Sequence, residues 1–318
     1  MEPRSQSILT YLSVERGLTA RQLARLNPFA SGKRPSPITR HIKNKSGEIL
    51  RSYQYPGTYD LTLQCLTSLF KKKKVGRQQE ITVREEKVNH NAEFVWYIRP
   101  DKEFDTERYN QDKRVPIDPD NKDHELDCAE VFVSLANAVN FDFEHRLTHW
   151  DYGWTKKERE YFHIDDRYHV NYDRHFILDG REYFLEVDRG SKDPDAVKEQ
   201  LKRYKVFLND YKKHDATVLF TMQPYHGQAF LNDLFHEPEE REKRRQARLL
   251  ERANKLFPIV KNLNTGNQIL LAFHKNVLSH PLERIWKSPQ NPNGFLSLGD
   301  LNKSSNAPSK AISNVGSK

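Results

Sequence analysis

The chain has 318 residues, and its 52 lysines and arginines against 44 aspartates and glutamates give a formal net charge of +8. This length favours about two domains, and 17 phenylalanines and 14 tyrosines are enough to build cores, which argues against a wholly disordered chain. No stretch approaches about 18 consecutive apolar residues, which excludes a membrane span. Two cysteines, Cys65 and Cys128, are too few for a disulfide framework or a zinc site by themselves, and they indicate a reducing, cytoplasmic setting.

The positive charge is concentrated in the first third of the chain. Residues 1–100 carry 18 basic and 8 acidic side chains, whereas residues 101–318 carry 34 basic and 36 acidic ones. A local basic excess is typical of a surface that binds polyanions such as nucleic acid, because lysine and arginine displace counterions from phosphates. A basic face that contacts only solvent is the alternative interpretation.

Two short helices are predicted near the start of the chain. Residues 5–16 have apolar side chains at helical spacing, and Gly17 ends this pattern. Thr19 is a suitable N-cap for a second helix over residues 20–26, which ends before Pro28. Two short helices around a glycine-containing turn are the beginning of a helix-turn-helix.

Two segments compete for the third helix. Residues 37–43 could begin at a serine cap followed by proline, whereas residues 60–70 place leucines on one face and end in a run of lysines. We favour 60–70, because the alternating residues 81–83 and the apolar run 94–98 that follow it predict a hairpin. Three helices and a hairpin form a winged helix-turn-helix, and residues 32–57 are then a basic insertion.

The N-terminal module is expected to bind DNA through its basic side chains. Four consecutive lysines at the end of the third helix exceed what the helix dipole alone favours, so we expect them to contact phosphates, which gives affinity without sequence readout. The residues of this module expected to contact DNA are Lys71, Lys72, Lys73, Lys74, Arg77, Arg40 and Lys43.

Composition predicts the domain boundaries. A winged-helix domain is expected over residues 1–100, a polar linker over 101–122, and a second domain over 123–287; Pro100, Pro116 and Pro119 lie at or within the linker. Residues 288–318 are rich in serine, asparagine, glycine and proline, which predicts a flexible tail.

The second domain alternates helices and strands. The pattern predicts, in order, a helix at 124–139, strands at 141–147, 168–178 and 183–188, a helix at 193–211, a strand at 216–222, a helix at 238–255 and a strand at 268–274. Asp179 and Gly180 form a strong hairpin-turn signal between the second and third strands. This order indicates an α+β to α/β fold with a mixed central sheet flanked by helices.

Three acidic residues are expected to meet on this hairpin. Asp173 lies on one arm, and Glu186 and Asp188 lie two positions apart on the other, where they point to the same face. Antiparallel pairing brings Asp173 beside them. Three carboxylates repel one another unless a cation neutralises them, and a site rich in oxygen ligands suits Mg²⁺ or Mn²⁺, which can polarise a phosphodiester and activate a water. An exposed acidic strand face is the alternative, which the apolar residues between the acids disfavour.

A family resemblance rests on these residues. An acid, a hairpin and the motif 186–188 (Glu-Val-Asp) between helices resemble the core of the PD-(D/E)xK nucleases. Residues 124–126 (His-Glu-Leu), 184–190 (Phe-Leu-Glu-Val-Asp-Arg-Gly) and 200–204 (Gln-Leu-Lys-Arg-Tyr) resemble the replication-relaxation family over about residues 5–275. That family includes the C-class plasmid mobilisation relaxases, which combine a winged helix with a restriction-endonuclease-like domain.

The resemblance implies that Asp173 and Glu186 bind the divalent metal. Asp188 occupies the position of the usual catalytic lysine, and an acid cannot supply the positive charge that lysine offers to the transition state. Either a second metal or a lysine of the next helix, Lys198 or Lys202, compensates, or cleavage is weak or absent.

Other residues of the resembling motifs carry expected roles. His124 and Glu125 begin a helix where they can face the acids, and His124 is a candidate acid or base; the alternative is that they only decorate the first turn. Arg203 is a candidate phosphate ligand.

The expected function is that of a DNA relaxase, a metal-dependent endonuclease that nicks one strand at an origin of transfer or replication of a plasmid or other mobile element. Its expected partners are double-stranded and single-stranded origin DNA and other mobilisation proteins, such as a coupling protein. One alternative is a non-catalytic DNA-binding accessory or regulator with a degenerate nuclease domain, and another is a defence nuclease that cuts both strands. The sequence has no P-loop and no nucleophile elbow, which disfavours an ATPase motor and a serine hydrolase.

Overall fold

The computed structural model describes residues 3–15, 17–26, 38–43, 46–79, 94–98, 122–152, 170, 172–210, 216–224, 236–288 and 294–305. Among these residues, no helix combines the length and the apolar character that crossing a bilayer requires. The predicted linker at 101–122 lies outside the described residues except for its last one.

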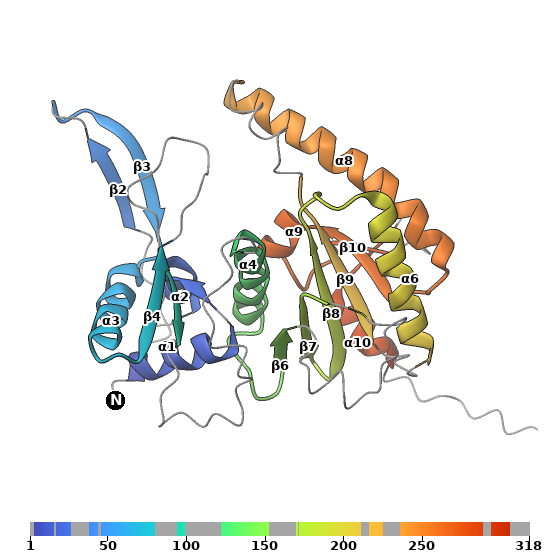
Figure 1. Cartoon of the computed structure of the whole chain (residues 1–318), viewed down its shortest axis with the longest axis horizontal. Helices are drawn as coiled ribbons and strands as arrows, with labels where there is room; N and C mark the ends of the chain where they lie inside the picture. Colours follow the sequence, from blue (N-terminus) through green and yellow to red (C-terminus); the bar gives the residue numbers. More distant parts are fainter. Residues whose placement is uncertain are drawn as a thin grey trace, which may run out of the picture.

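Three helices and a small sheet form the N-terminal part (Figure 1). The helices are α1 (Pro3–Val14), α2 (Ala20–Leu26) and α3 (Tyr59–Lys71), and the antiparallel sheet has the order β1 (Leu18–Thr19), β5 (Phe94–Ile98), β4 (Val75–Gln79). Ile8, Leu9 and Leu12 repeat at helical spacing and are buried against the rest of this core.

Reciprocal hydrogen bonds start α2. The backbone N–H of Gln22 donates to Thr19 Oγ1 at 3.2 Å, and the backbone N–H of Thr19 donates to Gln22 Oε1 at 2.8 Å. This exchange is a capping box, which satisfies two donors that the first helical turn leaves without partners. The predicted N-cap at Thr19 is confirmed.

The third helix is α3, as favoured from the sequence, and the alternative helix at 37–43 is wrong. That segment is instead strand β2 (Ile38–Lys43), which pairs with β3 (Ile49–Tyr55) in a hairpin that projects from the N-terminal part (Figure 1). The predicted strand at 81–83 lies outside the described residues, and β4 supplies the strand that pairs with β5. A Cβ at Gly76 of β4 would overlap the ring of Tyr97, so a larger residue there requires this ring to move.

A mixed sheet of seven strands forms the second part of the chain. Its order is β12 (Phe295–Leu296), β11 (Trp286–Lys287), β10 (Ile269–Phe273), β9 (Thr217–Met222), β8 (Arg181–Asp188), β7 (Arg174–Leu178), β6 (Leu147–Tyr152). The three central strands, β8, β9 and β10, are parallel to one another, and the remaining neighbours are antiparallel. The prediction of an α+β fold with a mixed central sheet is therefore confirmed.

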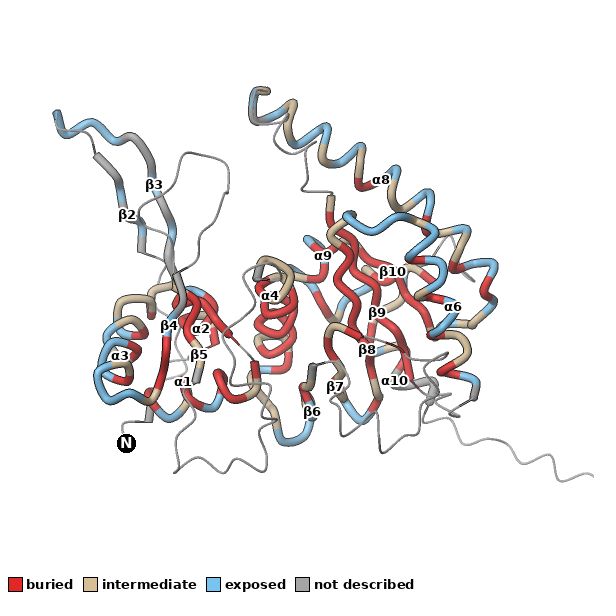
Figure 2. The backbone as a smooth tube through the Cα atoms, in the orientation of Figure 1, coloured by how far each residue is buried: buried red, intermediate tan, exposed pale blue. Residues whose placement is uncertain are grey.

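Helices cover both faces of this sheet (Figures 1 and 2). The helices are α4 (Lys122–Ala138), α6 (Pro194–Asp210), α8 (Pro238–Leu263), α9 (His274–Ser279) and α10 (Leu298–Ser305). Alternate residues of β8 divide between the two cores: Leu185 and Val187 pack in the core that contains α4, and Phe184 packs in the core that contains α6 and α8. Glu186 and Asp188 have the same parity as Phe184, so they belong to the face that α6 and α8 cover.

Two predicted elements are wrong. Residues 141–146 form turns rather than a strand, because Asn140 and Phe141 adopt left-handed backbone angles (φ 54° and 62°) that end α4 and reverse the chain, and β6 begins only at Leu147. The flexible tail predicted from residue 288 is wrong for 294–305, where β12 and α10 form and Leu298 is fully buried. A polar composition did not reveal the few apolar residues that anchor this segment.

Candidate functional site

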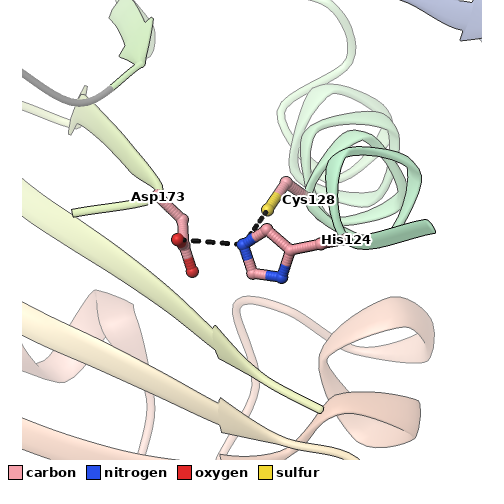
Figure 3. Close-up of side chains that lie close together, drawn as sticks. All are labelled: His124, Cys128 and Asp173. Atoms are coloured by element: carbon pink, nitrogen blue, oxygen red, sulfur yellow. Dashed lines mark hydrogen bonds and ion pairs between the residues drawn. The ribbon is translucent and has the colours of Figure 1, made fainter. Parts of the chain in front are cut away.

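Strand register brings two of the predicted acids together. Arg174 at the start of β7 pairs with Leu185 of β8, so the preceding residue, Asp173, lies next to Glu186. His124, in the first turn of α4, reaches the same place, and its Nε2 lies 2.9 Å from Asp173 Oδ1 (Figure 3). The structure therefore places Glu186 and His124 each beside Asp173, and the catalytic and metal-binding roles expected of them stay predictions.

Both oxygens of Asp173 are held in position. The backbone N–H of Val187 donates to Oδ2 at 2.6 Å, while Oδ1 faces His124. Burial disfavours the charge of Asp173, but the hydrogen bond and charge of His124 and the Val187 N–H together lower the pKa of this carboxyl. Burial likewise disfavours the imidazolium, yet the hydrogen bond and charge of Asp173 raise the pKa of His124 above its usual value. Each member of the pair therefore favours the charged form of the other.

Glu186 is a buried acid whose pKa shifts in the opposite direction from that of Asp173. Its residue is 2% exposed, and the Tyr204 hydroxyl donates to Oε1 at 2.5 Å. Burial first, and then the negative charge of Asp173, raise the pKa of Glu186 well above its usual value, although hydrogen bonds from Tyr204 and Gln200 oppose the rise. A buried acid beside a second acid, with opposite pKa shifts, is typical of a functional site.

A pocket of about 500 Å³ opens beside these acids. Its lining residues are Val170, Tyr172, Asp173, Lys192, Ala196, Glu199, Gln200 and Arg203. Lys192 Nζ donates to Gln200 Oε1 at 3.1 Å, and the charge of Lys192 acts on both Asp173 and Glu186. Arg203 was predicted as a phosphate ligand, and it lies on the wall of this pocket. The pocket wall therefore carries Asp173 and two cations, Lys192 and Arg203, while Glu186 lies next to Asp173 and is not one of the lining residues.

Sequence reasoning missed Lys192 as a site residue. A signal was available, since Lys192 comes directly after Gly190 and Ser191 at the carboxyl end of β8, and ligands bind at the carboxyl ends of parallel strands. The two lysines named from the sequence, Lys198 and Lys202, are instead exposed on α6 and do not line the pocket, and Lys202 pairs with Glu199 at 2.6 Å.

Asp188 does not join the cluster of acids, and this expectation is corrected. Its carboxylate receives two hydrogen bonds from Arg252 of α8, from Nε at 2.9 Å and from Nη2 at 3.0 Å. The side chains of Asp188 and Arg252 are 1% and 11% exposed. Strand alternation puts Asp188 on the face of Glu186, as predicted, but α8 covers the end of the strand and neutralises this charge. The predicted cluster of three mutually repelling carboxylates is thus not formed.

Glu125 is paired with Arg174 and not with the acids of the pocket. It accepts a hydrogen bond from Arg174 Nη2 at 2.8 Å, and the same nitrogen donates to Glu15 Oε1 at 2.7 Å. Arg174 and Glu15 are 2% and 1% exposed, and Trp150 Nε1 donates to Glu15 Oε2 at 2.8 Å. Since Glu15 directly follows α1, this buried cluster joins the N-terminal part to the residue that follows Asp173.

The predicted DNA-binding residues have varied positions. Lys71 ends α3, and Lys72, Lys73 and Lys74 form the turn that follows, with the first three of the four side chains exposed. The guanidinium of Arg77 lies over the rings of Phe94 and Phe70, at 4.2 and 4.8 Å from their centroids, so Arg77 packs on the core through cation–π contacts. Arg40 and Lys43 lie on β2, and their side chains are outside the described part of the structure.

The chain matches a known protein family. The sequence pattern that defines the replication-relaxation family matches residues 9–222, two thirds of the chain. The chain belongs to this family. No curated protein and no solved structure gives a significant match. The matched range begins within α1, includes Asp173 and Glu186, and ends with β9, before α8, which supplies Arg252.

Family membership indicates a role in the replication or mobilisation of a plasmid or other mobile element. The resemblance seen in the sequence is thereby confirmed at the level of the family.

Proposed function

We propose that the chain is a metal-dependent DNA endonuclease that nicks one strand at an origin of transfer or replication, in the manner of a C-class plasmid mobilisation relaxase. The observation that carries this proposal is the adjacent pair of acids, Asp173 and Glu186, of which Asp173 lines a pocket together with Lys192 and Arg203. Membership of the replication-relaxation family supports DNA as the substrate.

The donor set fits a hard divalent cation. Mg²⁺ is usually bound through one or two carboxylates, with waters and substrate phosphates completing its shell. Asp173 and Glu186 supply two such carboxylates, and a bound Mg²⁺ or Mn²⁺ would favour the charged form of Glu186, which burial alone disfavours. When bound, the ion polarises the phosphodiester and activates a water.

The remaining groups of the pocket bind and orient the DNA. In this proposal Lys192 places its ammonium beside the acids and supplies the positive charge that the Asp188 position lacks. Arg203 binds a neighbouring phosphate from the pocket wall. His124 holds a proton on Nε2 against Asp173 and acts as an acid or base for the leaving or attacking oxygen.

The N-terminal part would bind the duplex beside the cleavage site. The order α1, α2, α3 with an antiparallel sheet of β1, β5 and β4 is compatible with a winged helix-turn-helix, and the mixed sheet of the second part is compatible with a PD-(D/E)xK core. Lys71 to Lys73 extend from the end of α3 into solvent, where they can contact phosphates.

A second candidate is a DNA-binding accessory protein without cleavage. It is favoured by one observation, the bidentate pairing of Asp188 with Arg252, which fills the position of the usual catalytic lysine with a neutralised acid. In that case the second part would be a scaffold for the N-terminal module.

One assay separates these functions. Supercoiled plasmid carrying the origin is incubated with Mg²⁺ or Mn²⁺ and with the wild type, Asp173→Ala or Glu186→Ala. We expect the wild type to form open circles and each variant to lose at least about 100-fold in rate, as when a group that stabilises the transition state is removed. Linear product would indicate a double-strand nuclease, and binding without cleavage would indicate the accessory protein.

A further inference from the structure

A second set of donor atoms lies on the other side of Asp173. His124 and Cys128 are four residues apart on α4, so their side chains share one face of the helix. Cys128 Sγ lies 3.9 Å from His124 Nε2, which in turn lies 2.9 Å from Asp173 Oδ1 (Figure 3). These sulfur, nitrogen and oxygen atoms all lie within 4.8 Å of one another.

We propose that His124, Cys128 and Asp173 bind a thiophilic divalent cation of the zinc class. This goes beyond the proposed magnesium-dependent function, since thiolate sulfur is a ligand that Zn²⁺ prefers and Mg²⁺ avoids. Bond lengths of about 2.0–2.3 Å in a tetrahedral site place the ligand atoms about 3.4–3.6 Å apart. The distances of 2.9 and 3.9 Å from His124 Nε2 bracket these values. The three ligand atoms spread over at most 4.8 Å, so side-chain movements of about an ångström would close them around an ion.

The three ligands are held before any ion binds. The N–H of Val187 anchors Asp173 Oδ2 and leaves Oδ1 facing His124, which is how a neighbouring group orients a metal ligand. Cys128 is fully buried within α4, whereas the side chains of His124 and Asp173 are 27% and 18% exposed. Three protein ligands with one accessible side leave a fourth position for water, as in open zinc sites.

Proton release accompanies binding. The ion replaces the thiol proton of Cys128, which passes to the solvent as the metal–sulfur bond forms. The Nε2 proton of His124, which faces Asp173, also passes to the solvent as Nε2 binds the ion, and the ring keeps its proton on Nδ1. This site shares Asp173 with the proposed magnesium site and uses His124 Nε2, so His124 does not act as the proposed acid or base while the zinc-class ion is bound.

Cobalt substitution tests the site directly, because Co²⁺ replaces Zn²⁺ in such sites and a cobalt–thiolate bond absorbs in the near ultraviolet. Co²⁺ is titrated into the full-length, metal-free protein under reducing conditions. We expect a thiolate-to-cobalt band that saturates at one ion per chain and disappears when Zn²⁺ is added.

Cys128→Ser and Cys65→Ser are matched variants, since the chain contains two cysteines and Cys65 lies on α3, away from this cluster. We expect the band to be lost in Cys128→Ser and in His124→Gln, and to be retained in Cys65→Ser, with the circular dichroism melt showing that each variant is folded. No band in the wild type, or a band that persists in folded Cys128→Ser, would overturn the proposal. The readout is ion binding alone, so its result does not depend on whether the chain nicks DNA.

Discussion

Replacing Arg174 with methionine is expected to destabilise the protein by about 3–5 kcal/mol, the cost of leaving buried charges without their partner. Arg174 donates to Glu15 and Glu125, both inside the junction between the N-terminal part and the sheet. Without the guanidinium these carboxylates would remain in a region that excludes water. Denaturant unfolding, followed by the fluorescence of Trp150, which itself donates to Glu15, measures this loss.

Two further variants serve as controls for the effect of Arg174→Met on stability. Arg146 forms a bidentate pair with Asp179 at the surface, where the side chains are 38% and 32% exposed, so Arg146→Gln is expected to cost at most about 1 kcal/mol. Combining Arg174→Met with Glu15→Gln and Glu125→Gln removes all three charges and is expected to recover most of the lost stability. If Arg174→Met is as stable as Arg146→Gln, the buried cluster is not what joins the two parts.

Glu186→Gln is expected to raise the melting temperature of the metal-free protein at neutral and higher pH. Burial and the charge of Asp173 raise the pKa of Glu186 well above its usual value, so the folded protein takes up a proton that the unfolded chain releases. The stability of the wild type therefore falls as the pH rises from the usual pKa of glutamate through the raised folded value. The glutamine side chain keeps an oxygen that accepts the hydrogen bond of the Tyr204 hydroxyl. Because glutamine does not ionise, the variant does not lose stability as the pH rises.

The pH dependence of the melting temperature shows whether the ionisation of Glu186 causes the difference between variant and wild type. The melting temperature is measured in the presence of a chelator across the range from about pH 5 to about pH 9, where the difference between variant and wild type should grow and then level off. We expect a gain of about 3 °C or more, because about 1 kcal/mol shifts the midpoint by about 2–4 °C in a domain of this size. Glu182→Gln is the matched control, since Glu182 lies on the same strand and pairs with His175 at 2.9 Å. An equal or lower melting temperature for Glu186→Gln at every pH would contradict the assignment of Glu186 as a strained buried acid.

The part of the site that could be predicted from the sequence depends on local rules. Alternation along β8 and the turn at Asp179 and Gly180, both with left-handed backbone angles, set the register that brings Asp173 beside Glu186. Helix periodicity placed His124 at the start of α4. These relations connect residues that share an element or a hairpin, so sequence spacing determines them.

The remaining features depend on contacts between distant segments. Arg252 reaches Asp188 from 64 positions away, and Arg174 reaches Glu15 from 159 positions away, so no periodicity reveals either pair. The sequence predicted residues 32–57 as an insertion but did not predict that they contain the hairpin of β2 and β3. In each case the packing of whole helices and strands determines which residues lie next to each other.

The proposed nicking activity depends on a divalent ion bound between Asp173 and Glu186, and titration of Mn²⁺ with the wild type and Glu186→Gln tests this binding most directly. Free Mn²⁺ is followed by its electron paramagnetic resonance signal, with Glu182→Gln as the control. We expect wild type and Glu182→Gln to bind Mn²⁺ equally and Glu186→Gln to lose at least about 10-fold in affinity, as expected when a ligand of a metal site is removed. Equal Mn²⁺ affinity in wild type and folded Glu186→Gln would contradict the account.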